Sequence, residues 1–124
     1  MPVLVKTTDY YFNHPLHSML ETFPNPGVSW VCLKQTEHTS LCPITGQPDY
    51  GTVEISYVPN KLCLESKSLK LYLMTYRNEG TFCETSCNNI FEDVKKVLRP
   101  KTLSVKVTYI SRGGITIQSE KVGE

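Results

Sequence analysis

The chain of 124 residues lacks the features that define several large classes of protein. No apolar run approaches the ~20 residues that a membrane span requires, and the first residues do not show the basic-then-apolar pattern of a signal peptide. Thirteen Lys and Arg against twelve Asp and Glu give a formal net charge of +1, which argues against a basic nucleic-acid arm or an acidic tail. Repeats and low-complexity tracts are absent too. We expect a single globular, cytoplasmic domain over residues 1–124.

Cysteine occurs five times, but never in a Cys-x-x-Cys pair. An odd count without an export signal predicts reduced thiols. The missing pair gives a structural zinc site little support, so no metal is expected. Cys32 and Cys63 are expected to be small buried residues within strands. Cys42 differs from them because it stands in a polar loop.

Alternation of apolar and polar residues predicts four strands. Their ranges are 28–33, 52–58, 103–109 and 115–117, with the turn Arg112-Gly113-Gly114 before the last. Residues 1–26 have no sustained periodicity and are expected to form an irregular lead-in. The segment over residues 39–50 is rich in Thr, Pro and Gly, which predicts an ordered loop.

Two helices are expected between the second and third strands. One covers residues 68–76, where four apolar residues recur at helical spacing. For the other, Thr81-x-x-Glu84 resembles a capping box, with Thr85 and Ser86 as rival caps, and Pro100 bounds its end. The order strand, strand, helix, helix, strand, strand predicts an α+β fold, an antiparallel sheet with two helices on one face. Its open sheet edges favour a homo-oligomer.

A cysteine and an aspartate in the polar loop are candidates for catalysis. Cys42 is followed by Pro43, and Asp49 stands seven residues later. A partly exposed loop thiolate is a nucleophile, and a nearby carboxyl group that keeps its proton is a general acid. Spacing alone does not separate this interpretation from that of an ordinary loop Cys and Asp.

Positive charges at two places suggest an anion site. Lys67 and Lys70 are i, i+3 neighbours near a helix start, where both ammonium groups can reach one anion. Arg112 precedes two glycines, which permit close backbone approach. Solvated charges on a helix face and on a hairpin explain the same residues. A cap is the simplest role for Glu84.

Several motifs in register resemble one enzyme family. They are TSLCPITGQPDY at residues 39–50, ESKSLKLY at 65–72, YRNEG at 76–80 and SRGGI at 111–115. Together they closely resemble the NADPH-dependent 7-cyano-7-deazaguanine reductases, the QueF-type nitrile reductases of queuosine biosynthesis, in their short single-module form. The resemblance covers residues 36–117. It implies reduction of the nitrile of 7-cyano-7-deazaguanine to an aminomethyl group with two NADPH.

The resemblance assigns catalytic roles to the two loop residues. Cys42 would attack the nitrile carbon and form a covalent thioimide, and Asp49 would protonate the nitrogen. Glu84 matches the carboxylate that grips the guanine-like edge of the substrate, with Cys83 beside it.

The resemblance also places the two ligands. Lys67, Lys70 and Arg112 match the positions expected to hold the NADPH phosphates. Leu64, Glu65 and Ser66 match the segment that borders the substrate. No membrane and no direct nucleic-acid partner is implied.

The fold implied by the resemblance is the tunnelling fold, shared with GTP cyclohydrolase I. In this fold the subunits join their sheets into rings, with sites at the seams between subunits. The open edges expected above agree with such rings. The lysines at the helix start can then serve the site of a neighbouring subunit.

One residue departs from the family pattern. The reductases usually carry histidine before the substrate-binding glutamate, and here that residue is Cys83. A thiol is a weaker hydrogen-bond donor with a reference pKa of ~8.5 against ~6.5 for imidazole. The rival hypothesis is therefore a QueF-like amidinotransferase, in which ammonia attacks the thioimide to give an archaeosine-type amidine. Such relatives lack the NADPH motif, which is complete here at residues 65–72. A non-catalytic binding protein is a third hypothesis, against which the presence of Cys42 and Asp49 argues.

Overall fold

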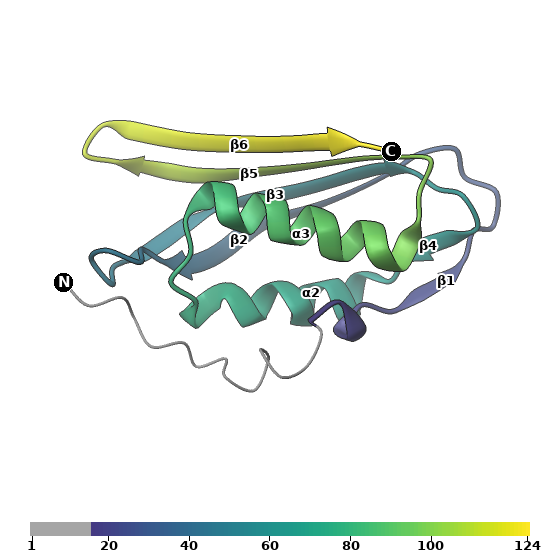
Figure 1. Cartoon of the computed structure of the whole chain (residues 1–124), viewed down its shortest axis with the longest axis horizontal. Helices are drawn as coiled ribbons and strands as arrows, with labels where there is room; N and C mark the ends of the chain where they lie inside the picture. Colours follow the sequence, from purple (N-terminus) through teal and green to yellow (C-terminus); the bar gives the residue numbers. More distant parts are fainter. Residues whose placement is uncertain (1–15) are drawn as a thin grey trace.

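The computed structural model describes residues 16–124 (Figure 1). In chain order its elements are η1 (Leu16–Met19), β1 (Thr22–Pro24), β2 (Val31–Leu41), β3 (Pro48–Val58), β4 (Leu62–Leu64), α2 (Ser66–Met74), η2 (Thr75–Asn78), α3 (Cys83–Leu98), β5 (Thr102–Arg112) and β6 (Ile115–Gly123). Most of the expected lead-in, residues 1–15, lies outside the described residues. The rest of it holds η1 and the short strand β1.

A four-stranded antiparallel sheet forms one layer of the molecule, with strand order β2-β3-β5-β6. Helices α2 and α3 lie against the same face of this sheet (Figure 1). Strands β1 and β4 form a separate two-stranded antiparallel ladder at one end. The α+β class and the antiparallel sheet with two helices are therefore confirmed.

The core lies between the sheet and the helices. The inward residues of the two central strands, Val53, Ile55, Tyr57, Leu103, Val105 and Val107, are at most 1% exposed. The buried stripe of α3 includes Ile90, Phe91, Val94 and Leu98. Because one face of each element is apolar at its own period, burial of these faces holds the two layers together.

Four local expectations were wrong. Cys32 is exposed, because its side of the edge strand β2 faces away from the helices. The capping box at Thr81 does not form: Phe82 is the N-cap of α3 and makes no side-chain cap bond. Residues 39–41 and 48–50 are not loop but extend β2 and β3, with Thr39 paired to Tyr50. The first helix, expected over residues 68–76, begins earlier, since α2 starts at Ser66.

The outer edges of β2 and β6 have no strand partner within residues 16–124. Apart from Leu41 of β2, which is bridged to Gly80, these edges can pair their backbone donors and acceptors with another chain. Within the same residues, no helix is long and apolar enough to cross a membrane.

Candidate active site

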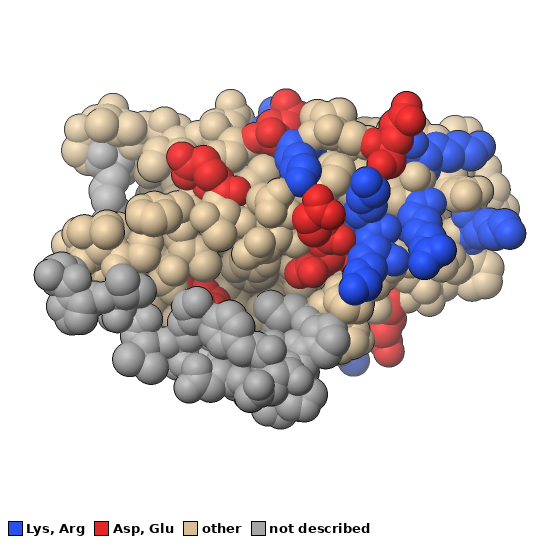
Figure 2. Space-filling model, viewed as in Figure 1, with Lys and Arg blue, Asp and Glu red and all other residues tan. Residues whose placement is uncertain are grey.

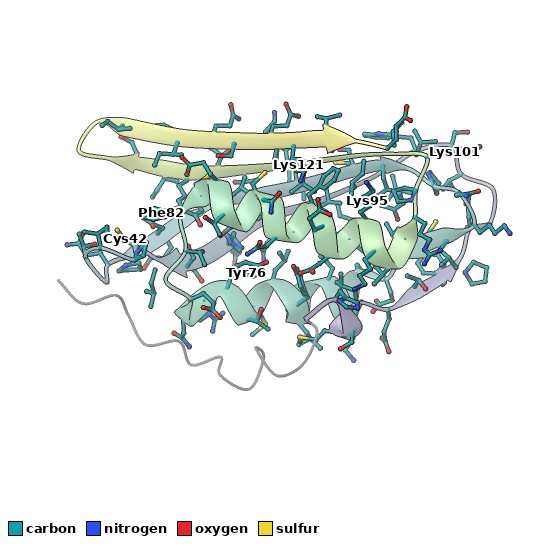
Figure 3. All side chains as sticks on the ribbon, in the orientation of Figure 1. Cys42, Tyr76, Phe82, Lys95, Lys101 and Lys121 are labelled. Atoms are coloured by element: carbon teal, nitrogen blue, oxygen red, sulfur yellow. The ribbon has the colours of Figure 1, made fainter. Side chains whose placement is uncertain are left out.

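A tight turn places Cys42 at the tip of the β2–β3 hairpin (Figure 3). The Cys42 amide donates to the carbonyl of Gln47 at 2.8 Å, and the Gly46 amide donates to the carbonyl of Cys42 at 2.9 Å. Gly46 has φ 74°, a left-handed conformation that glycine adopts without strain. The turn fixes the backbone of Cys42 and leaves its side chain partly exposed.

Hydrogen bonds in this turn favour the thiolate of Cys42. The side chain and backbone of Thr45 lower the pKa of the thiol below its ordinary value. Burial and the nearby charge of Asp49 act in the opposite direction, and the net pKa is lowered. A lowered pKa raises the fraction of nucleophilic thiolate at neutral pH.

Asp49 lies on the second strand of the same hairpin. It is the cross-strand partner of Ser40, two residues before Cys42. Asp49 is partly buried and lines a hollow of about 290 Å³ with Ile110 and Ser111 of the β5–β6 hairpin. The structure therefore brings the two predicted catalytic residues together at one end of the sheet.

The start of α3 lies beside this hairpin. The Leu41 amide donates to the carbonyl of Glu79 at 2.9 Å, and the Thr81 amide donates to the carbonyl of Leu41 at 3.1 Å. These bonds hold the segment before α3 against the strand that carries Cys42, and Figure 3 places Phe82 at the same end as Cys42. Glu84, in the first turn of α3, is exposed.

Cys83 has a different environment from its neighbour Glu84. Its side chain is 1% exposed, and Sγ donates to the carbonyl of Val107 at 3.4 Å. Burial raises the pKa of this thiol. The thiol is directed at β5, so only the backbone of Cys83 borders the exposed surface around Glu84.

The residues expected to border the substrate from β4 and α2 form a second group. Leu64 is buried, and its amide donates to the hydroxyl of Tyr57 at 2.8 Å. Glu65 caps α2: its carboxylate accepts from the amides of Lys67 at 2.6 Å and Ser68 at 2.7 Å, and these bonds lower its pKa. Ser66 is exposed.

The two lysines of α2 belong to this second group. Lys67 and Lys70 are exposed, and neither forms a salt bridge within residues 16–124. Lys70 and Ser66 line a hollow of about 200 Å³ against Leu33 of β2. The start of α2 therefore presents two unneutralised cations beside an apolar surface.

The Cys42 group and the group at the start of α2 lie far apart in the folded subunit. α2 starts at β4 and runs toward the Cys42 end, and its nine residues span about 14 Å at 1.5 Å per residue. Figure 1 shows the β2–β3 turn and the start of α2 at opposite ends of the molecule. Arg112 belongs to the Cys42 end by its place in the β5–β6 hairpin. The three expected cofactor residues are therefore divided, two at one end and one at the other.

The Lys and Arg side chains visible in Figure 2 gather over the second half of α3, away from the Cys42 end. Lys95, Lys96 and Arg99 line a hollow of about 670 Å³ there, together with Glu92 and Asp93. The mixed charges of this hollow leave it no strong preference for an anion. No cluster of His, Cys, Asp or Glu suited to a metal ion occurs in the part of the chain that the structure describes.

Sequence reasoning did not identify four buried side chains beneath the site. Ser40 and Ser86 are fully buried, and His38 and Tyr109 are nearly so. Nothing in their local sequence marks them, because the contacts among them join strands and helices far apart in the chain.

Comparison with known proteins gives consistent results. A family model described as "QueF-like protein" matches residues 48–122. The chain is 46% identical to the NADPH-dependent 7-cyano-7-deazaguanine reductase of Helicobacter acinonychis (strain Sheeba), over 95% of this chain and 81% of the relative. It is 47% identical to the enzyme of the same name from Streptococcus mutans serotype c, over 89% of this chain and 69% of the relative.

A solved structure is also similar. It is the archaeosine synthase QueF-Like in the apo form, with a TM-score of 0.73 and 25% sequence identity. The match covers 77% of this chain and 94% of that one.

Proposed function

Because this chain belongs to the QueF-like protein family, we propose that it is an NADPH-dependent oxidoreductase that reduces the nitrile of 7-cyano-7-deazaguanine to an aminomethyl group. The observation that carries the proposal is the identity of 46% over 95% of the chain with a reductase of that name. The hairpin that holds Cys42 beside Asp49 agrees with it.

Cys42 performs the first bond-forming step. Its thiolate adds to the nitrile carbon: a carbon–sulfur bond forms, one carbon–nitrogen π bond breaks, and the nitrogen takes a proton from Asp49. The product is a thioimide on Cys42. The lowered pKa of the thiol supports this step, because the thiolate is the attacking species. Cys42 is released again as a thiolate once the former nitrile carbon has been reduced.

Glu84 orients the substrate. Its exposed carboxylate stands in the first turn of α3, beside the segment bonded to Leu41. A carboxylate accepts hydrogen bonds from a ring N–H and an exocyclic amine together, which is the donor pair on the guanine-like edge of the substrate. Cys83 contributes its backbone alone, since its thiol is bonded to β5.

The start of α2 suits the phosphates of a dinucleotide. Lys67 and Lys70 are exposed, one helical turn apart and without salt bridges in residues 16–124, so both can form charge-assisted bonds to phosphate oxygens. NADPH supplies hydride when bound, and two hydrides take a nitrile to an amine. Arg112 provides a third cation from the β5–β6 hairpin.

We infer that two chains complete each site. The substrate-side residues at Cys42 and the cofactor-side residues at Lys67 lie far apart within one subunit, since α2 begins away from the β2–β3 turn (Figure 1). A second copy that pairs its sheet edge with this one brings its own α2 start toward Cys42. The free edges of β2 and β6 support such ring-like assembly.

NADPH oxidation, followed by its near-ultraviolet absorbance, tests the reaction. We expect two NADPH consumed per nitrile, and loss of at least about a thousand-fold in rate for Cys42→Ala. Cys32→Ala is the matched control, because Cys32 is an exposed thiol on β2, the strand that leads into the Cys42 turn. Wild-type protein that binds the nitrile but consumes no NADPH would contradict the proposal.

Mixing of two inactive variants tests the shared site. Cys42→Ala lacks the nucleophile, and the double variant Lys67→Ala, Lys70→Ala lacks the cofactor cations. After random reassembly about a quarter of the sites would contain both intact halves, so we expect about a quarter of wild-type activity. Activity that stays at the level of the separate variants would place the whole site in one chain.

The amidinotransferase remains the second candidate, because the archaeosine synthase QueF-Like is similar in fold. Its signature is an adduct of the nitrile on Cys42 with no NADPH consumption, followed by formation of an amidine when ammonia is added. The identity to the reductases favours reduction.

A further inference from the structure

Four hydroxyl groups meet in the interior beneath the catalytic hairpin. The hydroxyl of Tyr109 lies 2.8 Å from Oγ of Ser40 and 3.4 Å from Oγ of Ser86. Oγ of Ser86 lies 2.7 Å from Oγ1 of Thr81. Ser40 and Ser86 are fully buried and Tyr109 is 4% exposed. Because water has little access, these hydroxyls depend on one another for hydrogen bonds.

Two of these residues stand close in sequence to a proposed functional residue. Ser40 stands two residues before Cys42 and is paired with Asp49. Ser86 stands two residues after Glu84 on α3. Tyr109 comes from β5, which β3 separates from β2. Its one hydroxyl contacts both Ser40 of β2 and Ser86 of α3.

The ring of Tyr109 has little freedom to move. Its cross-strand partner is Gly51, where an added Cβ would lie 2.0 Å from the carbonyl oxygen of Thr108. Strands β3 and β5 therefore approach here in a way that only glycine allows. Gly51 is also the cross-strand partner of His38 on β2. The ring of His38 stacks on the ring of Tyr109, with centroids 6.5 Å apart and planes 22° apart. Ring packing fixes the place of the hydroxyl.

We propose that Tyr109 is a positioning residue for nitrile reduction, whose hydroxyl fixes the separation between Cys42 and Glu84. The proposal rests on the function proposed above. Glu84 holds the base and Cys42 attacks its nitrile, so the spacing of β2 and α3 sets the distance from sulfur to carbon. Reacting atoms must approach within about 3–3.5 Å, and a displacement of about 1 Å can cost a hundred-fold in rate.

The experiment measures the formation of the covalent adduct by intact mass in the absence of NADPH, as a function of nitrile concentration. For Tyr109→Phe, which keeps the ring, we expect the maximal rate to fall at least about ten-fold. The half-saturating nitrile concentration should stay within two-fold, because Glu84 still binds the base. Alkylation of Cys42 by iodoacetamide, which needs no alignment by Glu84, should also stay within two-fold.

Tyr72→Phe is the matched control. Tyr72 is another fully buried tyrosine of the same core, and its hydroxyl bonds Asp93 and Tyr76 instead of a site segment. It should lose similar thermal stability and keep the wild-type rate of adduct formation. The double variant Tyr109→Phe, Ser40→Ala should be no slower than Tyr109→Phe alone, since both changes break the same bond between these two hydroxyls.

Three results would overturn the proposal. One is an unchanged maximal rate in Tyr109→Phe. The second is an equal fall in alkylation, which indicates general loosening of the hairpin. The third is an equal fall in Tyr72→Phe, which indicates lost stability only. Wild-type protein that forms no adduct contradicts the proposed function instead, so the two failures are distinct.

Discussion

The carboxylate of Glu65 accepts a hydrogen bond of 2.6 Å from the backbone amide of Lys67. The residue expected to border the substrate is thus also the cap of the helix that begins with the expected cofactor lysines. Its other oxygen accepts from Ser68. A change at Glu65 therefore alters both the helix start and the position of Lys67.

The first prediction concerns this cap. The amide bonds hold the pKa of Glu65 below its ordinary value, so its contribution to stability is present above the ordinary pKa and is lost as pH falls through the lowered one. Glu65→Ala should melt at a lower temperature than wild type at pH 7. The difference should shrink below pH 4, as measured by thermal melts across pH. An equal difference at every pH would contradict this.

The second prediction concerns the thiol of Cys42. Thr45 is the largest cause of its lowered pKa. Thr45→Val removes the hydroxyl with little change of shape, so the pH profile of Cys42 alkylation should shift to higher pH. Alkylation that is quenched at set times and followed by mass spectrometry, from pH 6 to 10, measures the shift of this pH profile. A profile unchanged from wild type would show that the hydroxyl does not reach the thiolate.

The third prediction concerns Gly51. Its added Cβ would meet backbone, the Thr108 carbonyl at 2.0 Å, and backbone in a central sheet cannot move aside. Gly51→Ala should lose about 3 kcal/mol of unfolding free energy in urea denaturation. Gly123→Ala is the control, since its Cβ would meet the ring of Phe91 at 3.1 Å. A side chain can rotate, so that loss should be about 1 kcal/mol or less.

The fourth prediction concerns His38. Burial lowers its pKa from 6.5 to about 4. Nδ1 lies 2.9 Å from Oε1 of Gln35, while Nε2 has no hydrogen-bond partner among residues 16–124. Between these two pKa values the unfolded chain binds more protons than the folded one, so stability falls as pH drops through this window, by up to about 3 kcal/mol.

His38→Phe separates this effect from general acid denaturation. Phenylalanine keeps an aromatic ring against Tyr76 and Tyr109, which lie at centroid distances of 5.7 and 6.5 Å. Urea denaturation at pH 4 to 7 should show a flatter dependence for the variant. Parallel curves for the two proteins would assign the pH effect to other groups.

The two central strands and the longer helix could be predicted from sequence because each has one buried face. Val53, Ile55 and Tyr57 alternate with polar residues, and this period places them in the core whatever the neighbours are. The expectation that Cys32 is buried was wrong, because it lies on the face of a strand that is not buried. Its side of the edge strand β2 is solvent-facing, and only the cross-strand register with Ser56 defines that side.

The proximity of the two expected catalytic residues was predictable, but the arrangement of the elements around them was not. Cys42 and Asp49 share a hairpin, so their proximity follows from local sequence. The contact between Leu41 and Gly80 joins segments far apart in the chain, and the bond between Ser40 and Tyr109 spans 69 residues. Such contacts depend on how the layers pack, which no local pattern encodes.

The position of the α2 start, far from Cys42 in its own chain, has a consequence for assays. If each centre draws its nucleophile and its cofactor cations from two chains, turnover per chain is not a constant of the enzyme. It falls on dilution below the dissociation constant of the assembly and returns on concentration with second-order kinetics. A kinetic constant measured at one enzyme concentration then describes an association equilibrium as much as a chemical step.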